Sequence, residues 1–249
     1  MATTDRLTSS FTGPLMSLPT RSPGLATAGL CLALAVLGAA CGDSNGPSNR
    51  VALSGTVTDY FAATPIANAF LSVNELSVTG SAKANGTFRL TGIPTSSTLT
   101  VTVSAANYAA TVSDTIQFDT HSLTRSLQAV ASADVNRQFV AVGVGAVPGT
   151  AMVIATLPDA GTPLVGVPLV DIALRDSAQN TVGSGPYVVG ATGDLDPTLT
   201  QTSSFGGRSR IAYLNVPAGQ ATLTVTIAGG TPLVANVLTS ASGVTLVTP

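Results

Sequence analysis

Residues 50–249 are built from short apolar runs separated by turn residues. The pattern is clearest in residues 98–103, TLTVTV, where Leu99, Val101 and Val103 fall on one side of an extended chain and the threonines on the other. Alternation with a period of two predicts a strand with one buried and one solvent-facing side. The sequence therefore predicts a chain of short strands joined by turns.

The strand pattern occurs twice. Three runs of the first half match three runs of the second half in the same order: 64–73 with 162–171, 86–94 with 207–217, and 98–103 with 222–227. The offset grows from 98 residues (64 to 162) to 124 (98 to 222), which predicts an insertion near residues 184–205. We therefore expect two domains of one fold, 50–130 and 136–249, each with its own core.

The composition favours an all-β chain. Hydrophobic residues make up 45% of the chain, whereas 9% are charged and 4% are aromatic. Disordered chains are poor in apolar residues and rich in net charge, so this chain is expected to fold. Its Val, Ala and Leu residues in Thr-rich surroundings suit thin layers of strands. The net charge is −2 and the cations are scattered, which argues against nucleic acid as a partner.

An apolar segment, residues 25–40, precedes the strands. It follows Arg21, has no charge and ends in small residues, which is the organisation of a cleaved secretory signal. A retained membrane anchor is the alternative, but the segment is shorter than the roughly 20 residues that span a bilayer. We therefore predict that residues 1–40 are a signal peptide, with Met16 as an alternative start.

Cys41 follows this segment directly, and three roles compete for it. A buried thiol is disfavoured because the polar tract 42–49, GDSNGPSN, has nothing to cover it. A disulfide would need Cys31, the only other cysteine, which cleavage would remove. The third role is lipidation: Gly-Ala-Ala-Cys at 38–41 resembles the signal of bacterial lipoproteins, although Gly38 stands where that family usually has leucine.

The lipoprotein resemblance implies an acylated Cys41 held in membrane lipid. Each buried methylene contributes about 0.8 kcal/mol, so several acyl chains together anchor a protein firmly. Residues 42–49 would then form a flexible tether with a typical span of about 15 Å. The residue next to Cys41 is Gly42 rather than the aspartate that favours inner-membrane retention, so the outer membrane is the expected location.

Several motifs of the first half belong together. They are the opening Gly55-Thr-Val-Thr-Asp59, the run PIANAF after Thr64, the hairpin NGTFRLTGIP at 85–94, and Asn107-Tyr108. Residues 51–127 thereby resemble the carboxypeptidase regulatory-like domain, and residues 152–249 resemble it more loosely. Asn85 and Asn107 replace the Asp and Gly of that family at turns that tolerate asparagine.

The regulatory-like resemblance implies an all-β fold of two tandem, seven-stranded, transthyretin-like (prealbumin-like) β-sandwiches. Such domains are generally non-catalytic accessories, and a fold alone supplies no function. We predict a non-catalytic envelope lipoprotein that binds a glycan, a peptide or an envelope protein, or that has a structural role. One alternative is a subunit of an outer-membrane assembly recruited by strand addition. The other is an enzyme with an Asp-based site.

Few residues offer catalytic or metal chemistry. His121 is the only histidine, whereas zinc needs three or four ligands. A serine hydrolase needs its serine in a G-x-S-x-G turn between a strand and a helix, and no serine of this sequence is expected in such a turn. Asp194 and Asp196 in GDLDP could bind Ca²⁺, but this ion takes six to eight oxygens and Asp-x-Asp-Pro also forms plain turns. No other cofactor is predicted.

A ligand-binding site is also conceivable in the insertion and the strand after it. Arg208 and Arg210 share one face of a predicted strand, with Tyr187 nearby in sequence, and arginine pairs well with carboxylates or sugar hydroxyls. The alternative is a solvated strand face paired with Asp194 or Asp176. Long loops on rigid sandwiches often have functional roles, so this region is the first place to look.

The lipidation hypothesis predicts that wild-type cells incorporate labelled palmitate into this protein and that the Cys41→Ala variant does not. Mass spectrometry should find a mature N-terminus at an acylated Cys41. An unmodified Cys41 within an intact leader would overturn the predicted anchor.

Overall fold

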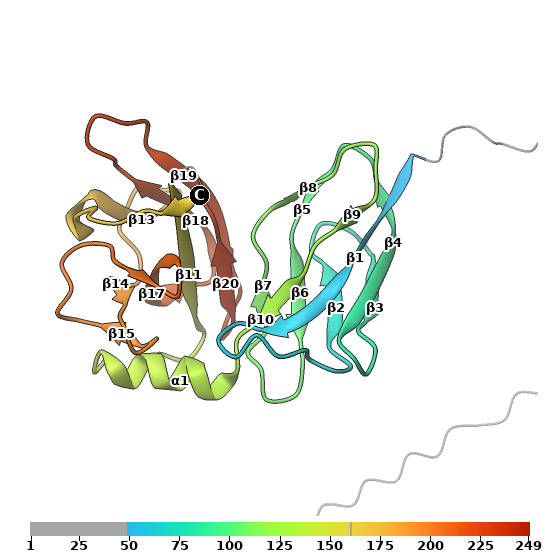
Figure 1. Ribbon diagram of the computed structural model, residues 1–249, viewed down its shortest axis with the longest axis horizontal. Coiled ribbons are helices and arrows are strands. Elements are labelled where there is room, and N and C mark those ends of the chain that lie inside the picture. Colours follow the sequence, from blue (N-terminus) through green and yellow to red (C-terminus); the bar gives the residue numbers. More distant parts are fainter. Residues whose placement is uncertain (1–48, 160) are drawn as a thin grey trace, which may run out of the picture. The chain divides into compact units, whose positions relative to one another are not determined.

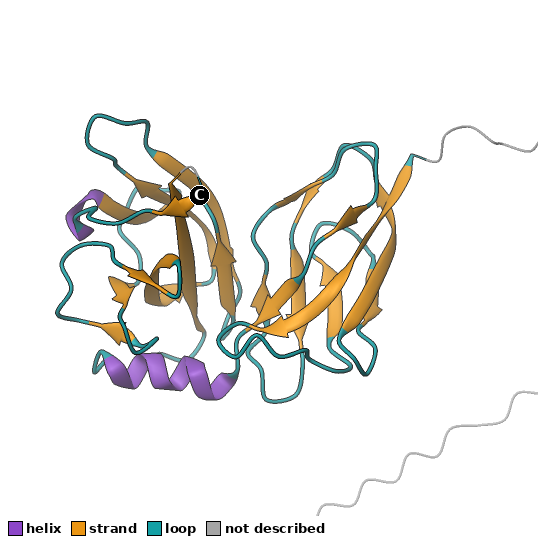
Figure 2. Cartoon of the chain, in the orientation of Figure 1, coloured by secondary structure: helices purple, strands orange, loops and turns teal. Residues whose placement is uncertain are grey.

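The computed structural model describes residues 49–159 and 161–249. They belong to one compact unit, Asn45–Pro249. Strands dominate this part of the chain, as the all-β prediction required (Figure 2). None of its helices has the length and apolarity that crossing a bilayer requires. The predicted signal peptide, Cys31, Cys41 and most of the tether lie outside the described residues, so their roles stay predictions.

The first half folds into two layers of strands (Figure 1). One layer has the order β10-β1-β4, with β9 also paired to β1, and the other includes β3-β2-β6-β7; β5 pairs with β8. Leu53, Leu71 and Val101, each at most 1% exposed, lie in the core of this half. The strands are β1 (Arg50–Asp59), β2 (Phe70–Val73), β3 (Thr79–Ser81), β4 (Thr87–Pro94), β5 (Thr98–Leu99), β6 (Val101–Ser104), β7 (Thr111–Val112), β8 (Ile116–Gln117), β9 (Leu123–Thr124) and β10 (Leu127–Ala129).

The second half also has two layers, with the orders β15-β14-β17-β11-β20 and β13-β18-β19. Its core includes Val153, Ile211 and Leu223, all fully buried. Its elements are α1 (Ser132–Ala141), β11 (Thr150–Asp159), β12 (Thr162–Pro163), the 3-10 helix η1 (Leu169–Asp171), β13 (Ile172–Asp176), β14 (Ser184–Val189), β15 (Leu195–Asp196), β16 (Ser204–Phe205), β17 (Arg208–Pro217), β18 (Gly219–Val225), β19 (Leu233–Thr239) and β20 (Val244–Val247).

The two halves repeat one strand arrangement. In the first, β1 pairs antiparallel with β4 and parallel with β9 and β10; in the second, β11 pairs antiparallel with β17 and parallel with β20. Residues 184–205, where the offset between the repeats increases, form β14, β15 and β16. These strands pair with β17 or with each other, so this segment widens one sheet of the second half.

The halves are joined through a shared sheet. Strand β20 pairs in parallel with β11 on one side and with β7 of the first half on the other, which makes one eleven-stranded sheet. The Val244 N–H donates to the Ala110 carbonyl at 2.9 Å. A third apolar cluster brings Tyr60 and Val130 of the first half against Met152 of the second. The sequence did not predict this shared sheet, because nothing local marks β7 and β20 as partners.

Helix α1 was not predicted either, since an all-β chain was expected and this segment overlaps the predicted domain boundary. Its N-cap residue, Ala131, supplies no side-chain cap. Tertiary contacts hold the helix instead. The fully buried Gln138 accepts the Leu195 N–H at 2.7 Å and donates to the Gly193 carbonyl at 3.3 Å, and Phe139 packs in the third cluster. Most helical stability in proteins arises from such packing.

The alternation in residues 98–103 is confirmed, with Leu99, Val101 and Val103 buried and the threonines more exposed. The predicted strand is nevertheless divided between β5 and β6. The Thr100 N–H donates to the Glu75 carboxylate at 2.9 Å rather than to a neighbouring strand. The run changes pairing partner at this point, from β8 to β2 and β7.

The motif residues of the first half lie at turns or at points where a strand changes its pairing partner. The Asp59 carboxylate, which is buried, accepts the N–H groups of Phe61 and Ala62 at 2.8 and 2.7 Å. Burial and the hydrogen-bonded, negatively charged Asp59 raise the pKa of Tyr108 above its usual value. Asn107 has a φ of 68°, which confirms the prediction that it accepts left-handed backbone.

Gly55 lies where β1 passes from pairing with β9 to pairing with β10. A Cβ at this position would clash with the backbone carbonyl of Arg125. We expect Gly55→Ala to lower the free energy of unfolding by about 2–3 kcal/mol, because backbone rather than a flexible side chain must move. Urea unfolding measures this change.

Gly145→Ala is the matched control, since a Cβ there meets nothing within 4 Å. It should change the free energy of unfolding by less than about 0.5 kcal/mol. Equal stabilities of the two variants would contradict the close approach at Gly55.

Candidate functional site

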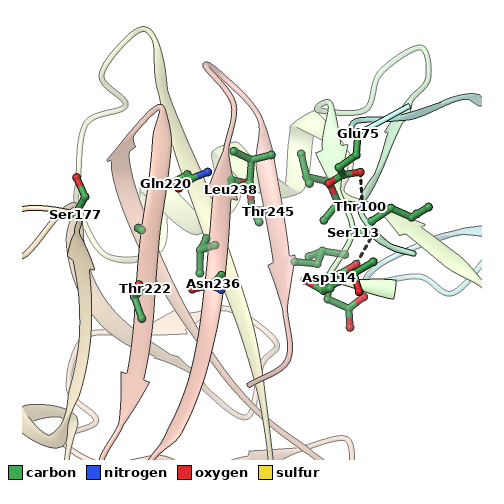
Figure 3. A pocket seen from close by; sticks show the side chains of 17 residues that line it. Glu75, Thr100, Ser113, Asp114, Ser177, Gln220, Thr222, Asn236, Leu238 and Thr245 are labelled. Carbon is green, nitrogen blue, oxygen red and sulfur yellow. Dashed lines mark hydrogen bonds between the residues drawn. The ribbon is translucent and has the colours of Figure 1, made fainter. Parts of the chain in front are cut away.

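A cleft with a volume of about 340 Å³ lies where the two halves meet (Figure 3). One wall comes from the first half and the other mainly from β18, β19 and β20. The walls are fixed relative to each other because β20 pairs with β7. Polar side chains lining the cleft include Glu75, Thr98, Thr100, Ser113, Asp114, Ser177, Gln220, Thr222, Asn236 and Thr245.

The polar groups of the first wall bond to one another. The Glu75 carboxylate accepts both the N–H and the hydroxyl of Thr100, each at 2.9 Å. Both oxygens of Asp114 lie 2.5 Å from one guanidinium nitrogen of Arg125. The Ser113 hydroxyl accepts the Val101 N–H at 3.0 Å and donates to the Asp114 carbonyl at 2.8 Å. This wall therefore holds its shape without a ligand.

The second wall offers unused hydrogen-bonding groups. Among the described residues, the side chains of Gln220, Thr222 and Asn236 have no hydrogen-bond partner. Thr245, by contrast, is buried and donates its hydroxyl proton to the Leu238 carbonyl at 2.7 Å. The side chains of Gln220 and Thr222 on β18 and of Asn236 on β19 are thus free to bind a ligand in the cleft.

The two aspartates proposed as calcium ligands have other partners. Asp194 forms an ion pair with Arg137, which also binds Asp134 at 2.8 Å. The hydroxyl and N–H of Thr198 both donate to Asp196 and lower the pKa of that carboxyl. In residues 49–159 and 161–249, no three His, Cys, Asp or Glu side chains are grouped to hold a metal ion. This geometry favours the turn over the calcium site.

The three proposed ligand-binding residues have different surroundings in the structure. Arg210 is only 8% exposed, so the solvated strand face considered as an alternative is wrong for this residue. Its guanidinium lies 5.5 Å from the ring centroid of Tyr60 and 6.0 Å from that of Phe205. Arg208 is exposed and lines a smaller cavity, whereas Tyr187 is half-buried and packs against the third apolar cluster.

His121 is exposed, and its Nδ1 lies 3.0 Å from the Thr120 hydroxyl. It lines a separate cavity of about 590 Å³ together with Asp119, and not the cleft. The cleft itself was missed in the sequence, since Gln220 and Asn236 are ordinary polar residues of alternating strands. No local motif marks them.

The motif residues Gly55, Asp59 and Tyr108 lie within one β-sandwich. Residues 52–131 match the carboxypeptidase regulatory-like domain. The first wall of the cleft lies within the matched residues, and the second wall lies outside them. No curated protein matches the chain.

Several solved structures are similar to the chain at low identity. The TIE protein of Bacillus anthracis is 13% identical over 80% of this chain and 33% of its own, with a TM-score of 0.28. The Streptococcal ancillary pilin is 14% identical over 81% of this chain and 62% of its own, at 0.26. The major pilin subunit of Bacillus cereus is 11% identical over 80% and 98%, also at 0.26.

The chain thus spans a third of the TIE protein and less than two thirds of the ancillary pilin. All three TM-scores lie below 0.5, so these structures do not indicate a function for this chain.

Proposed function

We propose that the chain is a non-catalytic binding module of the bacterial envelope, tethered to lipid through Cys41, that holds a glycan in the cleft between its halves. The observation on which the proposal rests is the row of free amide and hydroxyl groups on β18 and β19. Sugar hydroxyls both donate and accept hydrogen bonds, so Gln220, Thr222 and Asn236 are suitable partners for them.

The charges in the cleft fit an uncharged ligand better than a charged one. Asp114 is neutralised by Arg125, and the Glu75 carboxylate is already held by Thr100. The Glu75 carboxylate disfavours an anionic ligand beside it, and its oxygens can accept further hydroxyl donors. The buried apolar residues Leu99 and Val237 also line the cleft and can contact the carbon skeleton of a sugar.

The rigidity of the cleft supports a binding role. Because one sheet runs through both halves, the walls do not have to be assembled when a ligand arrives. Binding to preformed walls avoids the entropy cost of ordering them, which matters most for hydrogen-bonded ligands that gain little from apolar contact.

Strand addition is less well supported at this site. Strand β19 is the edge of its sheet, and an extended peptide would have to pair with that edge. The Leu238 carbonyl on β19 already accepts the Thr245 hydroxyl, and Thr245 lies on β20. This contact occupies part of the edge that an added strand would need.

The proposal predicts that the purified full chain in mild detergent binds neutral glycans on a glycan array. Asn236→Ala and Gln220→Ala should each weaken binding by roughly fivefold, since each removes a hydrogen-bonding side chain from the cleft. Titration calorimetry with the best glycan of the array gives the dissociation constants.

Thr224→Ala is the matched control, because Thr224 lies on the same strand as Thr222 but does not line the cleft. It should leave the affinity unchanged. Failure to bind any glycan, or binding that neither cleft variant weakens, would contradict the proposal. Specific capture of extended peptides instead would favour the strand-addition alternative.

A further inference from the structure

Arg210 is a buried cation without a counter-ion. Its residue is 8% exposed and its Nε atom is buried without a hydrogen-bond partner. Among the described residues, no carboxylate forms an ion pair with its guanidinium. The two partners suggested by the sequence have other contacts: Asp194 pairs with Arg137, and Asp176 accepts the N–H groups of Ala178 and Asn180.

Aromatic rings compensate this charge only in part. The guanidinium lies near the rings of Tyr60 and Phe205, at 5.5 and 6.0 Å from their centroids. Cation–π contacts offset only a fraction of the free energy that is lost when a charge is buried away from water. Buried arginines therefore usually have a hydrogen-bonded anion as a partner.

Residues next to this cation line a cavity of about 230 Å³, although Arg210 itself is not part of the lining. Its lining includes Tyr60, on whose ring Arg210 stacks, and Thr156, the cross-strand partner of Arg210. Cross-strand partners direct their side chains to the same face of a sheet. Arg208, two residues before Arg210 on the same strand, lines the cavity as well.

Two polar side chains of the lining, Tyr60 and Arg208, have no hydrogen-bond or ion-pair partner among the described residues. The hydroxyl of Tyr60 is buried and makes no hydrogen bond, so it can donate to an anion. The remaining charged residues of the lining, Arg125 and Asp114, neutralise each other in a close ion pair. Arg208 and Arg210 then leave this region with an excess of positive charge.

We propose that this cavity binds an oxyanion, a phosphate or a carboxylate group, through the guanidinium of Arg208 and the hydroxyl of Tyr60. Arg210 stacks on Tyr60 and supplies a second, poorly hydrated positive charge close to the anion. Charge-assisted hydrogen bonds to planar guanidinium groups are among the strongest that proteins make. The proposal is independent of the glycan cleft, although the two cavities share Ser113, Asp114 and Leu246.

The test uses the full chain in mild detergent, with thermal unfolding and titration calorimetry in sodium phosphate, sodium acetate and sodium chloride at matched ionic strength. Wild type should melt at a higher temperature in phosphate or in acetate than in chloride, because a ligand that binds only the folded state stabilises it. A response to phosphate alone identifies a phosphate site, and a response to acetate identifies a carboxylate site.

Two variants test whether the stabilisation by phosphate or acetate arises from binding in this cavity. Arg208→Gln and Arg210→Met should each weaken anion binding about tenfold or more. In chloride, Arg210→Met should be at least as stable as wild type, because it replaces an unpaired buried charge with an apolar side chain. A lost anion response in this variant then cannot result from unfolding. Arg89→Gln, an exposed control that lines none of these cavities, should respond like wild type.

The inference is overturned if neither phosphate nor acetate stabilises wild type beyond chloride. It is also overturned if Arg208→Gln and Arg210→Met both respond to these anions as wild type does.

Discussion

The parallel pairing of β20 with β7 is the contact on which the rest of the structure depends. It involves only two residue pairs, Val244 with Thr111 and Thr245 with Val112, yet it joins a layer of each half into one sheet. The third apolar cluster reinforces the junction with Tyr60 and Val130 from one side and Met152 from the other. Both cavities of functional interest, the cleft and the oxyanion cavity, are lined by residues of both halves and exist only because this junction holds them together.

Much of the fold was predictable because it depends on local pattern. The alternation at residues 98–103 correctly separates buried valines from exposed threonines, and Asn107 adopts the backbone that its place in the motif requires. The internal repeat is also present in the strand pairing, since β1 and β11 each pair antiparallel with a later strand of their own half. Helix α1 was missed, since a buried Gln138 that bonds to Gly193 and Leu195, about 55 residues away, leaves no periodic signal in the sequence.

The candidate sites were predictable only in part, for the same reason. Alternation correctly suggested that Arg208 and Arg210 share a strand face, but their different exposure depends on Tyr60, which lies in the other half of the chain. Asp194 looked like a metal ligand because its partner, Arg137, lies on a helix that the sequence did not reveal. No sequence motif marks the cleft. The side-chain amides of Gln220 and Asn236 line the same cleft as Glu75 and Ser113 only because strands from distant segments pair with each other.

Hydrogen exchange at the Val244 amide tests the central claim most directly, since this N–H donates across the junction to Ala110 at 2.9 Å. If the halves form one unit, Val244 should exchange as slowly as Ile154, an amide within the core strand β11 of the second half. Rapid exchange at Val244 while Ile154 stays protected would show that the halves separate readily, and would contradict a rigid cleft between them.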